Sequence, residues 1–286
     1  MNQIKKGSIV VRKSHLRDVI FKVVKIFKTD NNTIALLRGL IERVEADSPI
    51  DDLELVNPKV VKEAYNNLNK KINDKIRQNL SLKNHSYFSN SNSSVDRNFR
   101  ETIITGKILH LDGDKKYSSK SYYYYKKLGL NAIVKNIPEY RQPRVVYSLL
   151  KIYNPDILII TGHDGMIKRD VGYYDIYNYR NSRHFINTVK EARRYDTDFN
   201  KDTVIFAGAC QSYFEALISA GANFASSPAR ILIDFLDPIV IAEKIAITDK
   251  NKYISIDDVS MELRDGRKGV DGIGANGKMI RSVTLL

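Results

Sequence analysis

Short apolar runs alternate with longer amphipathic stretches from residue 101 to the end of the chain. The apolar runs have the length and composition of buried strands, and the stretches between them have the spacing of helices. We expect strands at 107–111, 132–137, 156–161, 203–207 and 222–226, and helices at 115–128, 141–153, 182–195, 211–220 and 238–247. This order predicts an α/β fold over residues 101–286, a three-layer αβα sandwich around a mostly parallel sheet.

Residues 1–57 follow a different pattern, in which apolar and polar positions alternate in short runs at 9–11, 19–27 and 33–37. The polar residues 30–32 supply a turn between two of these runs. The pattern predicts a small SH3-like β-barrel. Such a module either binds a ligand or packs passively against the rest of the chain, and the sequence favours neither role.

Residues 58–100 are rich in Asn, Lys and Ser, and they carry nine Lys and Arg against three Asp and Glu. Apolar residues recur at helical spacing from 60 to 82, which predicts a helix, whereas the second half, with its Ser-Asn run at 89–94, is expected to be a mobile linker. Nearly half of the net charge of +13 lies in this segment. The larger α/β part is only mildly basic, so a nucleic-acid groove across it is not expected.

The chain has 286 residues and a single cysteine, Cys210, which cannot form a disulfide within the chain. No apolar stretch approaches the ~20 residues of a membrane span, and the N-terminus lacks the apolar block of a secretory signal. We therefore expect the protein to stay in the cytosol. Histidine and cysteine spacings typical of zinc sites are absent, so we expect neither a metal nor a cofactor.

Candidate chemistry gathers where the predicted parallel strands end, because ligands bind at the carboxyl edge of such sheets. Residues 110–114 follow the first strand, 161–165 the third, and 208–212, with Cys210, the fourth. A predicted helix starts just after Cys210, and unpaired N–H groups there lower the pKa of a thiol and favour the thiolate. The alternative is a plain core residue, since free cysteines are commonly buried.

All five histidines precede Cys210. This order disfavours papain-like proteases, glutamine amidotransferases and α/β-hydrolases, whose catalytic histidine follows the nucleophile. The remaining arrangement is a His-Cys dyad of the caspase type, with His163 about 50 residues before Cys210. In it Cys210 attacks the scissile carbonyl, His163 protonates the leaving amine, and backbone N–H groups near Gly165 and Cys210 hold the oxyanion. His110 is expected to pack or to orient the adjacent acidic loop, and His184 to lie on a helix surface.

Asp112 and Asp114 flank Gly113 at the mouth of the same predicted cleft. Their carboxylates suit a pocket that binds a basic residue of a substrate. They suit equally well a turn in which an aspartate caps the following helix. Two carboxylates could also contribute to a divalent-cation site, but nothing else in the sequence completes one.

Five motifs resemble one family, the sporulation-specific YabG endopeptidases of spore-forming Firmicutes, along nearly the whole chain. They are residues 6–14 (KGSIVVRKS), 109–114 (LHLDGD), 154–164 (NPDILIITGHD), 206–212 (FAGACQS) and 220–228 (AGANFASSP). The resemblance implies a caspase-like cysteine protease that processes spore coat and cortex-related proteins and cleaves after arginine. It also implies synthesis in the mother cell and association with the forming spore coat. His163 is followed by Asp164-Gly165, where caspases and clostripains commonly have glycine directly.

An arginine-preferring site tethered to a basic linker predicts self-cleavage in that linker, at Arg77, Arg97 or Arg100. Two other functions stay open. One is a non-enzymatic spore-coat assembly or nucleic-acid adaptor that uses the N-terminal barrel and the basic linker. The other is a cysteine amidase that acts on small molecules. The sequence gives no oligomeric state.

Overall fold

The computed structural model describes residues 3–29, 32–90, 99–168 and 172–285, and it has an α/β fold with mixed sheets. Its central six-stranded sheet has the order β13-β11-β10-β9-β7-β8. The strands are β7 (Ile108–Asp112), β8 (Ala132–Asn136), β9 (Ile157–Thr161), β10 (Val204–Ala207), β11 (Phe224–Ser226) and β13 (Val270–Gly272). The first five pair in parallel, as apolar runs joined by helices predict. The sequence pattern did not predict β13, which pairs antiparallel to β11.

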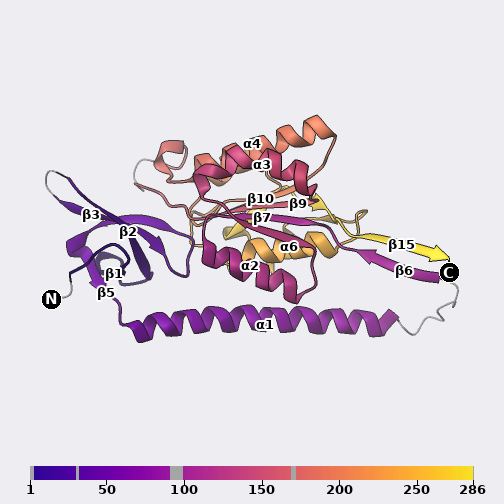
Figure 1. Ribbon diagram of the computed structural model, residues 1–286, viewed down its shortest axis with the longest axis horizontal. Helices are drawn as coiled ribbons and strands as arrows, with labels where there is room; N and C mark the ends of the chain where they lie inside the picture. The colour runs from indigo at the N-terminus through magenta and orange to yellow at the C-terminus, as the bar shows by residue number, and fades with distance from the viewer. Residues whose placement is uncertain (1–2, 30–31, 91–98, 169–171, 286) are drawn as a thin grey trace.

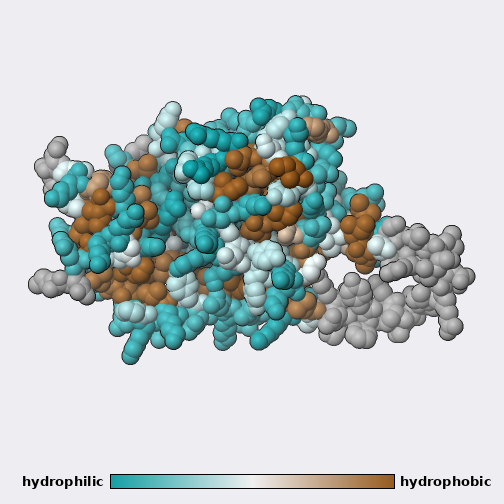
Figure 2. Space-filling model, viewed as in Figure 1, coloured by the Kyte–Doolittle hydropathy of each residue, from teal (hydrophilic) through white to brown (hydrophobic). Residues whose placement is uncertain are grey.

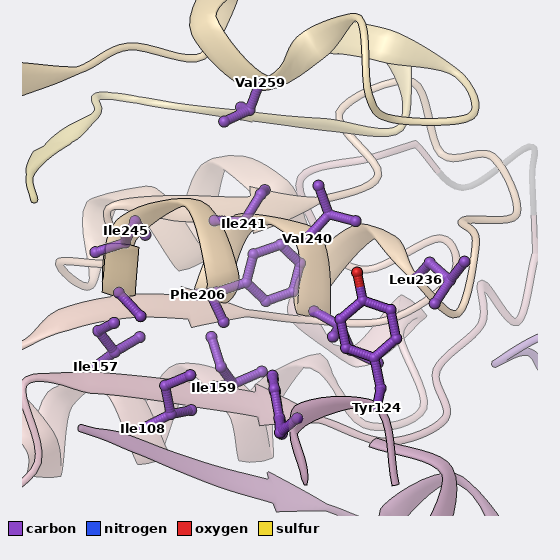
Figure 3. Packing of buried hydrophobic residues seen from close by; sticks show 14 of the residues in the cluster. Ile108, Tyr124, Ile157, Ile159, Phe206, Leu236, Val240, Ile241, Ile245 and Val259 are labelled. Carbon is purple, nitrogen blue, oxygen red and sulfur yellow. The ribbon is translucent and has the colours of Figure 1, made fainter. Parts of the chain in front are cut away.

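Helices cover both faces of the central sheet, α3 and α4 on one side and α2 and α6 on the other (Figure 1). The helices are α2 (Lys115–Lys127), α3 (Gln142–Tyr153), α4 (Ser182–Phe199), α5 (Phe214–Ser219), α6 (Asp237–Ile247) and α7 (Asp257–Ser260). Figure 3 shows α6, which carries Ile241 and Ile245, between the strands that carry Ile157 and Phe206 and the segment that carries Val259. The β-α order predicted from the sequence is confirmed, with ends that differ by a few residues.

Before the central sheet in the chain comes a five-stranded antiparallel sheet of order β4-β3-β2-β1-β5, called the N-terminal sheet here. Its strands are β1 (Ile9–Arg12), β2 (Phe21–Lys28), β3 (Thr33–Gly39), β4 (Glu45–Pro49) and β5 (Leu53–Leu55). The predicted alternation is present, since Phe21 and Val23 of β2 are buried and Lys22 between them is exposed. Among the ladders of the described residues none joins β4 to β5, and the likeness to an SH3 barrel stays a prediction.

A long helix, α1 (Pro58–Asn90), runs from the N-terminal sheet along the α/β part (Figure 1). It buries Leu68, Ile72 and Ile76 at helical spacing, and its outer side is hydrophilic (Figure 2). The predicted helix is thus confirmed. The linker prediction is wrong up to Asn90, which is still helical, and again at β6 (Phe99–Ile104), while residues 91–98 lie outside the described ranges.

The remaining strands are short or lie near the end of the chain. They are β12 (Tyr253–Ile254), β14 (Ala275–Asn276) and β15 (Ile280–Leu285), of which β12 pairs with β14 and β15 pairs with β6. None of the helices in the described ranges is long and apolar enough to cross a membrane. The predicted division into residues 1–57, 58–100 and 101–286 stays a prediction.

Candidate functional site

The residues singled out in the sequence come together at the carboxyl edge of the central sheet. β7, β9 and β10 are neighbours there, and Asp112 at the end of β7 lies opposite Thr161 at the end of β9. His163 and Cys210 follow β9 and β10, and both side chains are fully buried. The chain folds this way because parallel β-α units bring their strand ends to one edge.

The loop between β3 and β4 of the N-terminal sheet enters this edge. The carbonyl oxygen of Arg43 accepts the backbone N–H of Cys210 at 3.3 Å and that of Asp164 at 3.2 Å. Val44 forms a parallel bridge with Asp164, and the N–H of Glu45 donates to the Asp164 carbonyl at 2.7 Å. The loop is therefore held like a bound peptide, with one carbonyl aimed at two N–H donors beside the cysteine.

The side chain of Arg43 is fully buried. Its Nη1 lies 2.8 Å from Oδ2 of Asp112, and the guanidinium lies over the rings of Tyr117 and Phe235, 4.9 and 5.4 Å from their centroids. None of its three nitrogens makes an aligned hydrogen bond, so the ion pair and the two rings hold the charge. The sequence analysis missed Arg43, because nothing in the local pattern of residues 40–44 indicates where the loop docks.

Asp112 and Asp114 have different environments, although they are two residues apart. Asp112 is fully buried, and its oxygens accept the Asp114 N–H at 2.8 Å and the Thr161 hydroxyl at 2.9 Å. Burial raises the pKa of Asp112, and the charge of Arg43 opposes that shift. Asp114 caps α2 by accepting the N–H groups of Lys116 and Tyr117. The structure thus places Asp112 against a basic side chain and Asp114 at a helix cap.

His163 lies between the loop and a buried carboxylate. Its Nε2 is 3.3 Å from the carbonyl oxygen of Gly39, and its Nδ1 is 3.8 Å from Oε1 of Glu139. That same oxygen accepts the His163 backbone N–H at 2.8 Å. Burial disfavours ionised Glu139, but the contact with His163 and the charge of Arg38 outweigh it and lower the pKa of Glu139 to about 2. A carboxylate in this place fixes the orientation of an imidazole.

Glu139 is a second residue that the sequence analysis missed. It lies in a short 3-10 helix, Glu139–Arg141, shortly after β8. The rule that sites form where parallel strands end could have found it, because Glu139 follows the predicted strand 132–137. Glu139 has no histidine, cysteine or second carboxylate beside it in the sequence, unlike the other strand ends that carry candidate chemistry.

Cys210 is in the thiol form in this arrangement. Its Sγ accepts the N–H of Ile233 at 3.3 Å, and burial raises the pKa of the thiol to about 12. The lowered pKa expected from an adjacent helix is wrong for this state. One reason is that α5 begins only at Phe214, and the other is that the sulfur is packed in the core of the N-terminal sheet, with Val44 and Ile233.

Asp164 joins the loops that carry His163 and Cys210. Its carboxylate accepts hydrogen bonds from the backbone N–H groups of Gly165 and Asn181 and from the hydroxyls of Ser182 and Ser212. Burial raises the pKa of Asp164 to about 6, and these hydrogen bonds oppose the shift. A Cβ at Gly165 would lie 2.1 Å from the carbonyl oxygen of Glu45, so a glycine is needed where the loop passes.

His110 and His184 are the remaining candidate histidines, and Nε2 of His110 lies 3.8 Å from Oδ2 of Asp112. His110 packs as expected, with ring nitrogens 3.1 and 2.8 Å from the hydroxyls of Tyr125 and Thr161. His184 is half-buried on α4. Among the arginines predicted as cleavage sites, Arg77 is exposed on α1, Arg100 lies in β6, and Arg97 is outside the described residues.

Comparison with known proteins agrees with the motifs. The family model described as YabG peptidase U57 matches residues 5–284. The chain is 38% identical over 281 residues to the sporulation-specific protease YabG of Bacillus subtilis (strain 168), and the match covers 96% of each chain. No solved structure matches it. Because both matches span nearly the whole chain, this protein belongs to the YabG family of peptidases.

Proposed function

We propose that this protein is a cysteine endopeptidase that cleaves after arginine, with Cys210 as the nucleophile and His163 as the general acid and base. The observation that carries the proposal is the placement of Arg43. Its guanidinium meets the buried carboxylate of Asp112, while its carbonyl oxygen accepts two N–H groups, one of them from the cysteine itself. A substrate arginine before a scissile bond needs both contacts at once.

The proposed reaction uses the two N–H groups that donate to the Arg43 carbonyl and the imidazole of His163, which contacts the same segment at Gly39. The thiol proton of Cys210 passes to His163 as the sulfur attacks the carbonyl carbon of the substrate arginine. The N–H groups of Cys210 and Asp164 hold the oxyanion. In this proposal Asp164 replaces Gly165 as the partner of Cys210, because the Gly165 N–H already donates to the Asp164 carboxylate at 2.9 Å. His163 then protonates the leaving amine, and water hydrolyses the thioester.

We propose that the Asp112 carboxylate lies at the bottom of the arginine pocket and that the rings of Tyr117 and Phe235 form its walls. A planar guanidinium stacks on aromatic rings while its edge reaches a carboxylate, which the compact ammonium of lysine cannot do equally well. Asp114 supports the pocket indirectly, since it caps the helix that carries Tyr117. The pocket therefore favours arginine over lysine.

The biological setting is proposed from the family. The Bacillus subtilis relative is a sporulation-specific protease, and we propose the same role here, in the mother-cell cytoplasm at the forming spore coat. The proposed substrates are spore coat and cortex-related proteins that present an arginine in an extended segment. The bridge between Val44 and Asp164 supports this, because it engages the backbone just after the arginine.

The test is hydrolysis of a matched peptide set with Arg, Lys, Asp, Asn or Leu before the scissile bond. We expect cleavage after Arg that disappears in Cys210→Ala and weakens in Asp112→Ala. Cleavage that persists in Cys210→Ala would contradict the proposal. Salt-dependent nucleic-acid binding that survives Cys210→Ala, with no peptidase activity in the wild type, would instead support the adaptor.

A further inference from the structure

We propose that this protein cleaves its own chain between Arg43 and Val44, and that the uncut loop blocks the site for other chains. The inference rests on the proposed function, since it takes the same nucleophile and the same arginine pocket. The N-terminal sheet lies beside the α/β part in the fold (Figure 1), and its β3-β4 loop reaches the carboxyl edge of the central sheet. The loop is thus placed as an internal substrate.

Contacts on both sides of the bond support this placement. Before it, the carbonyl oxygen of Gly39 is 3.3 Å from Nε2 of His163. After it, Val44 and Glu45 are bound along Asp164, and the Val44 carbonyl accepts the Gly39 N–H at 2.8 Å. The two proposed catalytic residues therefore both contact the loop, through the imidazole of His163 and the backbone N–H of Cys210.

Glycines permit this close fit at two points. A Cβ at Gly39 would lie 2.3 Å from the carbonyl oxygen of Glu42, and one at Gly165 would lie 2.1 Å from that of Glu45. Either methyl group would push the loop away from its place. The fit is therefore a specific docking of the loop and not a loose surface contact.

The docked loop excludes any other substrate. The Arg43 side chain fills the pocket with no exposed surface, and its carbonyl oxygen uses both proposed oxyanion donors. A second arginine can reach Asp112 only after Arg43 has left. A protein made in this form is therefore inactive toward other chains until the loop is cut and displaced.

The cleavage balances as an ordinary hydrolysis. The Cys210 sulfur bonds to the Arg43 carbonyl carbon, the Arg43–Val44 C–N bond breaks, and the thiol proton passes through His163 to the Val44 amine. Water then gives its hydroxyl to the Arg43 carbonyl and a proton to the sulfur. The products are residues 1–43 and 44–286, held together by the β3-β4 and β1-β5 ladders until they separate.

The experiment incubates the purified full chain and identifies new amino termini by sequencing and intact mass. In parallel it follows hydrolysis of an arginyl peptide amide. We expect a new terminus beginning Val44-Glu45-Ala46, at a rate that does not change over about 100-fold dilution, as an intramolecular step requires. Peptide hydrolysis should begin after a lag that matches the appearance of this terminus.

Arg43→Gln and Arg43→Lys are the test variants, and Arg77→Gln is the matched control. We expect Arg43→Gln to slow the Val44 terminus about 100-fold, Arg43→Lys to slow it less while keeping the buried charge, and Arg77→Gln to cut like the wild type. Arg43→Lys keeps the test valid if the glutamine variant fails to fold.

Three outcomes would count against these proposals, and they can be told apart. Cys210-dependent hydrolysis of the arginyl peptide without a Val44 terminus would overturn this inference and leave the proposed function standing. No hydrolysis of the peptide by the wild type or either Arg43 variant, and no Val44 terminus, would overturn both. Full activity toward the peptide while the chain is still intact would overturn the inference that the uncut loop blocks the site for other chains.

Discussion

Arg43 and Arg77 are two basic residues in opposite environments. The side chain of Arg77 is 81% exposed on α1, 3.6 Å from Asp74, whereas that of Arg43 is fully buried against Asp112. Cleavage needs an extended backbone whose carbonyl reaches the oxyanion donors, which the helical backbone of Arg77 does not offer. The difference teaches that presentation of the backbone, and not exposure of the side chain, selects a bond for cutting.

The largest expected effect comes from removing the nucleophile. Cys210→Ala should lower both the cut at Arg43 and the hydrolysis of arginyl peptides by about 10,000-fold or more, because no other described group near the bond can form the thioester. Intact mass and peptide kinetics measure the two losses. Thermal unfolding of the variant should stay close to that of freshly purified wild type that is still uncut, which excludes misfolding as the cause. Comparable cutting in this variant would mean that another nucleophile acts.

The next effect concerns stability and compares the two arginines directly. In the Cys210→Ala background, where the chain stays intact, Arg43→Gln should lower the free energy of unfolding by about 3–5 kcal/mol, because it leaves Asp112 buried without its partner. Arg77→Gln should cause no measurable change, because its ion pair is solvent-exposed. Urea unfolding measures both. Equal midpoints for the two variants would show that the Arg43 contact contributes little to the fold.

A smaller effect separates the two aspartates. Asp112→Asn should lower kcat/KM for arginyl peptides about 100-fold, since the guanidinium loses its buried counter-charge. Asp114→Asn is the matched control, because asparagine also caps helices well, and it should stay within about twofold of the wild type. Steady-state kinetics of the two variants and the wild type, each measured after the chain has been cut between Arg43 and Val44, tests this prediction. If both variants lose activity equally, the pocket is not set by Asp112 alone.

The sequence predicted the central sheet well, because compact apolar runs such as 156–161 are too short for a buried helix and are typical of a buried strand. The pairing of His163 with Cys210 stays a prediction, and it rests on chain order, which separates the classes of cysteine hydrolase. Both predictions rest on patterns that are local or that need only the order of residues.

Arg43 and Glu139 were not predictable in the same way. Each reaches the site through packing between segments far apart in the chain, as when Gly39 in the N-terminal sheet meets His163. The thiol pKa was predicted in the wrong direction for the same reason, because the cover over Cys210 comes from another part of the chain. Local sequence reasoning proposed His163 and Cys210 as site residues, but the segment that contacts them depends on tertiary contacts.

The smallest expected effect tests the carboxylate behind His163. Glu139→Gln should lower kcat about 10-fold with little change in KM, because the carboxylate orients the imidazole without touching the substrate.

The same substitution should also change how the free energy of unfolding depends on pH in acid. With a pKa lowered to about 2, folded Glu139 binds protons less readily than it does in the unfolded chain, so its contribution to stability is present above about pH 4.5 and is lost as the pH falls toward 2. In the Cys210→Ala background, where the chain stays intact, urea unfolding across this range should therefore show a steeper acid loss with Glu139 than with Glu139→Gln. Parallel acid profiles, or a loss confined to KM, would mean that Glu139 does not position His163.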